Sequence, residues 1–247
     1  MTFNWNLFYQ STPYGYGGEI YFDWLRNSAM LTLSLAGTAW IIAFILGSIV
    51  GIMRTLDSKI LNRLAIGYIE LFRNIPLFVQ MFIWYTIMPL FLSGSFKEWF
   101  IQELDPDIQT FILVSIALGL FTSARIAEQV RTGIQTLPIG QRYAATALGL
   151  SKFQTYKYIL LPNAYRKIVP TLTSEMTNII KNSSIASQFG GLRELVGLIT
   201  SMNDQTNSII EILCVITITY MYINFLIIMF MRIVEYKTRL PNTMSGG

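Results

Sequence analysis

The sequence predicts an all-α membrane protein with five transmembrane helices. Of its 247 residues, 53% are hydrophobic and only 13% are charged, against roughly 25% charged residues in a typical soluble domain. Crossing the hydrocarbon core requires about 20 mostly apolar residues in a row. Four stretches meet this requirement clearly, at 27–53, 66–92, 110–130 and 209–231, and a more polar fifth lies at 169–189.

The polar stretch 169–189 is counted as a span because of its position between two basic regions. It contains Glu175 and Lys181 among several amides and hydroxyls. Polar residues inside a membrane usually face a bundle interior or a wet cavity. The alternative is an amphipathic helix lying on the membrane surface.

The distribution of charge orients the five spans. Residues 131–173 carry six Arg and Lys side chains and no acid, and residues 54–63 and the tail after 231 are also mainly basic. Residues 93–109 are mainly acidic. The positive-inside rule therefore places the N-terminus outside and the C-terminus inside. With only four spans, the two basic regions at 131–173 and after 231 would lie on opposite sides.

The chain ends flank the predicted transmembrane region. Residues 1–26 have no positive charge before Arg26, which does not fit a signal peptide. Their aromatic residues predict a periplasmic, interfacial segment, with anchors at Trp5, Phe8, Tyr9, Tyr21, Phe22 and Trp24. Residues 243–247 are expected to form a flexible end.

Several functions are disfavoured by the residue types. Cys214 is the only cysteine and histidine is absent, which removes the commonest metal ligands and the usual general base. The sequence has no GxxxxGK(S/T) phosphate-binding loop, and no basic run accompanies the aromatic residues as in a nucleic-acid groove. We therefore expect no catalytic residue, metal site, cofactor or nucleic-acid partner.

One polar loop carries a specific spacing of small and apolar residues. It reads YAATALGLSKFQTYKYILLP over residues 143–162, and its key positions are Ala144, Ala145, Gly149, Leu161 and Pro162. Small side chains allow close approach to another surface, glycine permits a turn, and Pro162 is expected to end the helix that follows the turn. The alternative is an ordinary amphipathic loop helix.

This spacing resembles the EAA loop of ABC importer permeases, which docks into an ATPase subunit. The acidic residue of that motif is replaced here by Tyr143, so its ion pair cannot form. The resemblance extends to the polar amino acid uptake permeases, and to those for glutamate and aspartate in particular. It implies a type I ABC importer permease fold over 27–242, with the coupling loop at 137–162.

The resemblance also implies the setting in which the protein works. The chain would be a non-enzymatic permease subunit in a bacterial inner membrane. Its partners would be two ABC ATPase subunits, a second identical or homologous permease, and a periplasmic or lipid-anchored amino-acid-binding protein. Transport would proceed by alternating access, and ATP would be hydrolysed by the separate partner.

A charged stripe lies deep in the third span. Arg125 stands about 14 residues after the span begins, or roughly 20 Å at 1.5 Å per residue. A guanidinium at that depth is costly unless it is paired or wet. One interpretation is a structural pair with Glu128, one turn away. The other is a binding residue for a substrate carboxylate, which the resemblance to acidic amino acid permeases favours.

Four further residues are predicted to bind substrate with Arg125. Thr122 shares its helical stripe, and Gln80 lies one turn beyond a kink expected at Pro76. Asn182 and Ser183 belong to a Lys-Asn-Ser-Ser stretch that resembles the pathway lining of this family. Basic amino acid permeases often carry aspartate at the position of Asn182, and an amide there suits an anionic substrate. The alternative is hydrogen bonding between helices.

The sequence leaves three transport functions open. The first is ATP-driven import of glutamate and aspartate. The second is import of glutamine or another polar amino acid by the same architecture, and the third is an ion-coupled carrier using Arg125 and Glu128 as a charge relay. Separately, Gly47 and Gly51 form a GxxxG pair that predicts a packing face on the first span.

Overall fold

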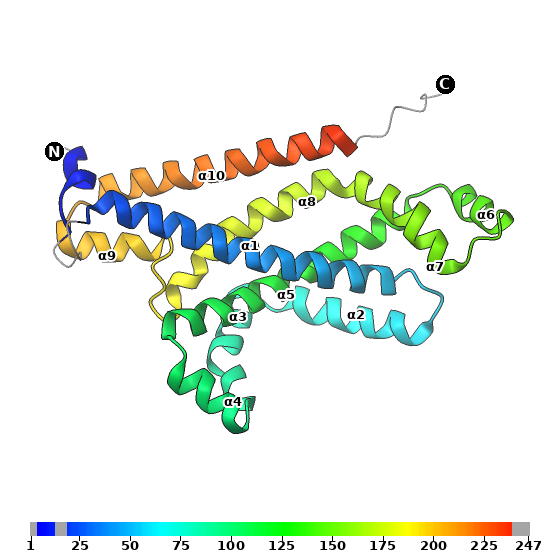
Figure 1. Cartoon of the computed structure of the whole chain (residues 1–247), viewed down its shortest axis with the longest axis horizontal. Helices are drawn as coiled ribbons and strands as arrows, with labels where there is room; N and C mark the ends of the chain where they lie inside the picture. The colour runs from blue at the N-terminus through cyan, green and yellow to red at the C-terminus, as the bar shows by residue number, and fades with distance from the viewer. Residues whose placement is uncertain (1–3, 13–18, 239–247) are drawn as a thin grey trace. The chain divides into compact units, whose positions relative to one another are not determined.

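The computed structural model describes residues 4–12 and 19–238. Their regular structure is helical, apart from one isolated bridge between Ser11 and Ile20, which confirms the all-α prediction (Figure 1). The flexible end expected at 243–247 lies outside the described residues. The chain divides into two compact units, which are described separately. The first comprises Met1–Ile41, Pro76–Gly119 and Asn178–Phe225, and the second Ile42–Ile75, Leu120–Thr177 and Leu226–Gly247.

Four long helices contribute residues to both units. They are α1 (Tyr21–Met53), α5 (Pro106–Gln135), α8 (Leu161–Ser183) and α10 (Ile209–Thr238). The shorter α-helices are α2 (Lys59–Asn74), α3 (Leu77–Thr86), α4 (Gly94–Glu98), α6 (Ile139–Ala147), α7 (Lys152–Thr155) and α9 (Gly197–Thr206). Single 3₁₀ or π turns form η1 (Trp5–Tyr9), η2 (Met88–Phe91), η3 (Trp99–Glu103), η4 (Tyr156–Leu160) and η5 (Ser184–Gln188).

Three of these helices, α1, α5 and α10, are long and apolar enough to cross a membrane. The predicted span at 66–92 is not one continuous helix, because α2 and α3 meet at a sharp bend. The residue before a proline is driven out of the helical region, and Ile75 adopts the extended conformation accordingly. Pro76 then caps the start of α3. At Pro76 the helix is therefore interrupted between α2 and α3, where the sequence predicted only a kink.

The helix predicted at 169–189 begins earlier, and Pro162 does not end a helix. Helix α8 runs from Leu161 to Ser183, directly after η4, and η5 completes the segment. Pro162 directly follows η4, a π turn that ends with a hydrogen bond from the Leu161 N–H to the Tyr156 carbonyl. The residues before this proline are already helical, and local π geometry lets a helix accommodate a proline. The helical run therefore continues through the predicted stop.

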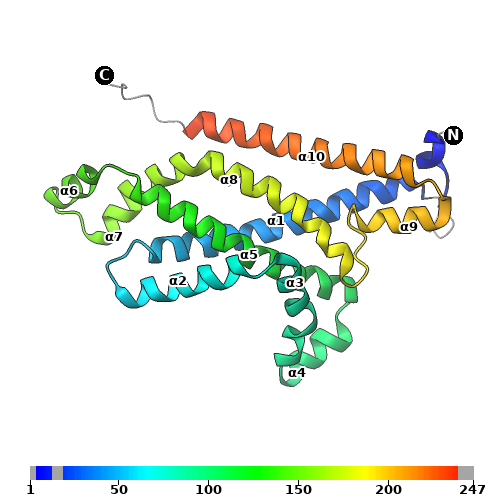
Figure 2. The same ribbon diagram turned by 180° about the vertical axis from the view of Figure 1, so that it is seen from behind.

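In the second unit, α1 lies directly against α5. A Cβ atom added to Gly47 would stand 2.7 Å from the Ser123 carbonyl oxygen, and one added to Gly51 would stand 2.6 Å from that of Ala127. Both views of the ribbon show α2 beside these two helices (Figure 2), and the Tyr68 and Ser123 hydroxyls lie 2.6 Å apart. The packing face predicted from the glycine spacing is confirmed.

In the first unit, the N-terminal segment is held against the start of α10. The Asn4 backbone N–H donates to the Glu211 carboxylate at 2.8 Å. The predicted anchors Trp5 and Tyr9 are exposed, whereas Phe8 and Tyr21 are buried. The anchor prediction is wrong for those two, since their rings belong to the core of this unit.

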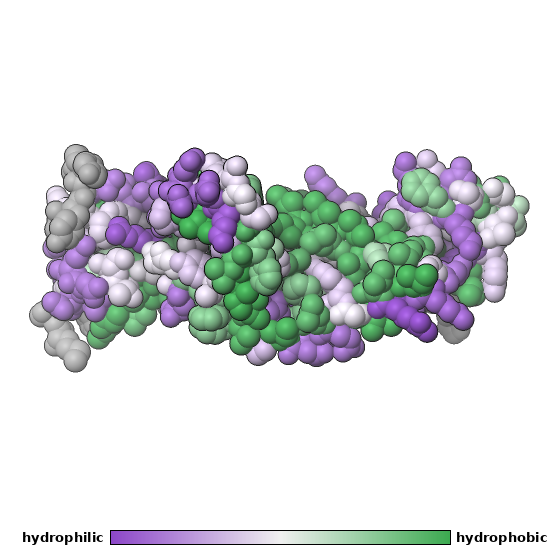
Figure 3. All heavy atoms as spheres, turned by 90° about the horizontal axis from the view of Figure 1, so that it is seen from below, coloured by the Kyte–Doolittle hydropathy of each residue, from purple (hydrophilic) through white to green (hydrophobic). Residues whose placement is uncertain are grey.

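Apolar side chains also cover much of the surface. Figure 3 shows one face on which they form continuous areas. On α1, Ile41, Ile45 and Ile49 are spaced by one turn, and each is more than half exposed. Continuous apolar surface of this kind marks contact with a membrane or another protein.

Candidate functional site

The predicted coupling loop forms two short helices joined by a tight turn. Helix α6 ends at Ala147, and Gly149 has a φ of 74°, in the region that glycine alone adopts readily. Ser151 then starts α7 through a capping box, in which its hydroxyl accepts from the Gln154 N–H and the Gln154 side chain accepts from the Ser151 N–H. The turn expected at Gly149 is confirmed.

The coupling loop presents a largely apolar surface. Tyr143, Leu148 and Phe153 are each at least 67% exposed. The other predicted coupling residues differ in exposure. Ala144 and Pro162 are exposed, Leu161 is half-buried and Ala145 is buried. An exposed apolar surface on a short helical hairpin is suited to contact with another protein.

Arg125 forms an ion pair with α8. Its Nε lies 2.9 Å from a carboxylate oxygen of Glu175, whose side chain is 6% exposed, while 43% of the Arg125 side chain is exposed. The Gln129 amide donates to the other oxygen of Glu175 at 3.1 Å. The distance that defines this pair is that from Nε, and a guanidinium has four other N–H donors.

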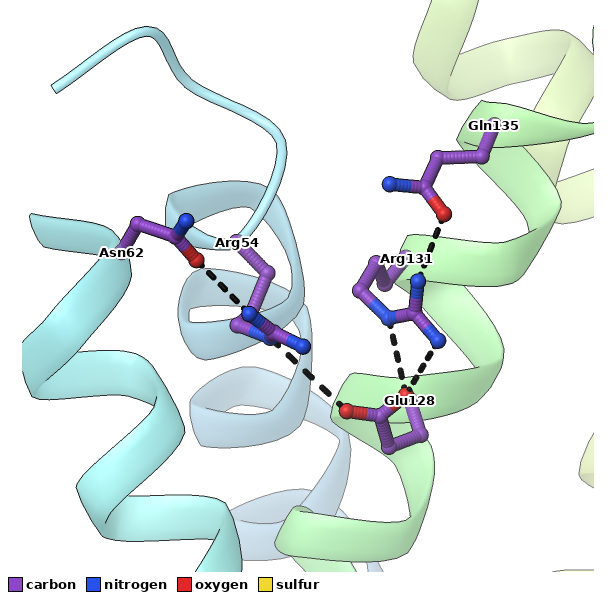
Figure 4. Close-up of polar contacts among 5 residues, drawn as sticks. All are labelled: Arg54, Asn62, Glu128, Arg131 and Gln135. Atoms are coloured by element: carbon purple, nitrogen blue, oxygen red, sulfur yellow. Dashed lines mark hydrogen bonds and ion pairs between the residues drawn. The ribbon is translucent and has the colours of Figure 1, made fainter. Parts of the chain in front are cut away.

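The partner of Arg125 is therefore Glu175 rather than Glu128, and the structural pair expected within α5 is wrong. Glu128 instead binds Arg131 twice, at 2.7 and 2.8 Å, and lies 3.8 Å from Nε of Arg54 (Figure 4). Arg54 donates to Asn62 on α2 at 2.7 Å. Of these contacts, only the Glu128–Arg131 pair follows from sequence spacing, because residues three apart are neighbours on a helix. The contacts of Arg54 and Arg125 join different helices, so no spacing indicates them.

The remaining predicted site residues are largely buried. Thr122 shares α5 and one compact unit with Arg125, whereas Gln80, Asn182 and Ser183 belong to the other unit. Thr122, Gln80 and Ser183 are at most 3% exposed, and Asn182 is half-buried. The Ser183 hydroxyl donates to the Ile180 carbonyl in its own helix at 2.8 Å. Their union with Arg125 in one binding site stays a prediction.

A buried carboxylate missed by the sequence analysis caps α9. Glu194 is 1% exposed and lies outside the candidate spans. It accepts the N–H groups of Val196 and Gly197 at 2.9 and 3.0 Å and the Tyr220 hydroxyl at 3.1 Å. Burial raises the pKa of Glu194 to about 7, and the three hydrogen bonds oppose this rise only in part.

We expect Glu194 to make the stability of the purified protein fall as pH rises. Its pKa in the folded protein, about 7, exceeds its ordinary value of 4.5, so the folded state binds the proton more tightly. Stability is lost between these two pKa values, by up to about 3 kcal/mol. Melting temperatures at pH 5 and pH 8 should differ less in Glu194→Gln than in the wild type. Equal pH dependence in both would contradict the assignment.

The comparisons with known proteins agree with this architecture. The family model described as "Binding-protein-dependent transport system inner membrane component" matches residues 23–240. The glutamate/aspartate import permease protein GltJ of Escherichia coli K12 is 46% identical over 98% of both chains. GltK, the glutamate/aspartate import permease protein of Escherichia coli O6:H1, is 31% identical over 74% of this chain and 75% of its own.

A solved structure extends the match to the fold. It is the crystal structure of an amino acid ABC transporter with histidines, which is 25% identical and covers 88% of this chain and 95% of its own, with a TM-score of 0.73. The fold is that of type I ABC importer permeases. With nearly its whole length matched, the chain belongs to the family of binding-protein-dependent transport system inner membrane components.

Proposed function

We propose that the chain is the permease subunit of an ABC importer that carries glutamate and aspartate across a bacterial inner membrane. The observation that supports this choice of substrate is Arg125 in the apolar helix α5, whose side chain is 43% exposed although its Nε lies 2.9 Å from Glu175. A guanidinium binds a carboxylate through two parallel hydrogen bonds. The identity of 46% with GltJ supports the same substrate class.

The proposal extends to the topology and the partners. Five spans, comprising α1, α2 with α3, α5, α8 and α10, place the N-terminus outside and the C-terminus inside. A second permease, identical or similar to this chain, completes the pathway, and the similarity to both GltJ and GltK supports a pair of related permeases. Two ABC ATPase subunits dock on the coupling loop, and a periplasmic or lipid-anchored binding protein delivers the substrate.

Each predicted residue then has a role in alternating access. ATP binding closes the ATPase subunits and moves the coupling loop, and the pathway opens outward. Arg125 binds the side-chain carboxylate of the substrate, while Thr122, Gln80, Asn182 and Ser183 supply hydroxyl and amide groups to the rest of it. Hydrolysis resets the pathway inward.

Uptake by reconstituted protein tests this function. We would measure labelled glutamate uptake into proteoliposomes that contain the permeases, the ATPase and the binding protein. Uptake is expected only with ATP on the ATPase side, and unlabelled aspartate should compete with it. Uptake driven by a proton or sodium gradient without ATP would support an ion-coupled carrier instead. Competition by glutamine but not by aspartate would assign the importer to another polar amino acid.

A further inference from the structure

The short loop between α1 and α2 contacts the helices that follow the coupling turn. The Tyr156 hydroxyl, on η4, lies 2.8 Å from the Thr55 carbonyl oxygen and 3.1 Å from the Thr55 hydroxyl oxygen. Lys152, on α7, binds Asp57 at 2.6 Å. The loop therefore meets the coupling region at two points.

These two contacts differ in strength. The Lys152 and Asp57 side chains are each 81% exposed, so water screens their attraction and the pair mainly sets orientation. The Tyr156 contacts are partly buried, where a hydrogen bond is less easily replaced by water. A pocket of about 330 Å³ lies beside them, lined by residues of the loop, α6 and α7. Because its contacts are partly buried whereas the Lys152–Asp57 pair is exposed, Tyr156 is the firmer of the two links.

The other side of the same loop is anchored to two helices. Arg54, directly after α1, donates to Asn62 on α2 at 2.7 Å and pairs with Glu128 on α5 at 3.8 Å (Figure 4). Its Nε is buried, and the guanidinium is always charged. Movement of the loop is therefore resisted by both helices together.

Helix α5 has its own connection to the coupling region. Only residues 136–138 separate it from α6, and Lys167 on α8 donates to the Thr136 carbonyl at 3.1 Å. Helices α1 and α2 have no such covalent connection to α6 or α7. The loop between them contacts η4 through Thr55 and α7 through Asp57.

We propose that the α1–α2 loop transmits the movement of the coupling helices to α1 and α2, with Tyr156, Thr55 and Arg54 as positioning residues. This inference rests on the proposed ABC importer function. Through the loop, one displacement of α6 and α7 reaches α1, α2 and α5 together. None of these residues belongs to the proposed substrate site, so their loss should uncouple ATP hydrolysis from transport.

The test is the number of substrate molecules taken up per ATP hydrolysed, measured in proteoliposomes with the complete set of subunits. Tyr156→Phe removes both contacts to Thr55 and is expected to lower this ratio about threefold to tenfold, on the scale of a partly buried hydrogen bond. ATPase binding and melting temperature should change little. Tyr236→Phe removes a hydroxyl from a tyrosine that is exposed on α10, outside the coupling loop, and should leave the ratio unchanged.

A second variant tests the other side of the loop. Glu128→Gln weakens the pair with Arg54 and should also lower the ratio, whereas Glu70→Gln, on the exposed surface of α2, should not. If Tyr156→Phe fails to assemble, the ratio in Glu128→Gln decides between the outcomes. A wild-type ratio in Tyr156→Phe, or an equal loss in Tyr236→Phe, would overturn the inference. Failure of the proposed function would appear differently, as wild-type protein without ATP-dependent uptake.

Discussion

Replacing Arg125 with alanine is expected to reduce glutamate uptake by roughly 30-fold or more, since removing one partner of a charged hydrogen-bonded pair costs about 2–5 kcal/mol. The proposed substrate carboxylate would lose its only cationic partner among the predicted site residues. Arg125→Lys keeps the positive charge but lacks the planar guanidinium. Its uptake should therefore lie between that of the wild type and that of Arg125→Ala. Labelled glutamate uptake at matched protein levels measures both effects.

The ion pair with Glu175 makes a further control necessary. In Arg125→Ala, the Glu175 carboxylate, 6% exposed, keeps only its contact with Gln129, and an unpaired buried charge is itself destabilising. The double variant Arg125→Ala/Glu175→Gln removes both charges. If Arg125 only compensates Glu175, this variant should recover uptake. If it binds substrate, uptake should stay low although the complex assembles.

Substitution of Gly51 by valine is expected to have the largest effect on folding. A Cβ atom there would stand 2.6 Å from the Ala127 carbonyl oxygen and 2.8 Å from Cβ of Val130, too close for any real contact. Overpacking in a well-filled interior costs about 1–3 kcal/mol, and more when backbone must move. We expect little folded protein, measured as monodisperse protein recovered in detergent.

Gly37 provides the matched control on the same helix. A Cβ atom at this position would meet nothing within 4 Å, so Gly37→Ala should leave the yield and melting temperature close to those of the wild type. Wild-type yield from Gly51→Val would contradict the close approach of α1 to α5. Equal losses from both substitutions would indicate a general intolerance of α1 to changes at glycine.

The sequence predicted those features that depend on local pattern. The helical class followed from apolar runs, the α1 packing face from Gly47 and Gly51, and the turn of the coupling loop from Gly149. Each depends on residues close together in the chain, where spacing determines which side chains share a face. Helix α8 begins before the predicted span at 169–189, and its additional first turns are polar.

The predictions that were wrong concern residues whose conformation or partner depends on the adjoining turn or on another helix. Pro162 was expected to end a helix, but the π turn η4 directly before it lets the helical run continue. Pro76 was expected to kink a span, but the extended conformation of Ile75 breaks it. A pair with Glu128 was one of the two interpretations of Arg125 because both residues lie on one helix, whereas Glu175 pairs with Arg125 from α8. Contacts between distant helices leave no spacing in the sequence.

The glycine contacts of α1 also determine the register of this helix on α5. A slide of α1 by one turn, about 5.4 Å, would bring the methyl group of Ala43 to the place of Gly47. That group would meet the Ser123 carbonyl oxygen well inside van der Waals distance. The close contact therefore opposes translation of α1 past α5 in this direction, while a movement of the two helices as a pair leaves it unchanged.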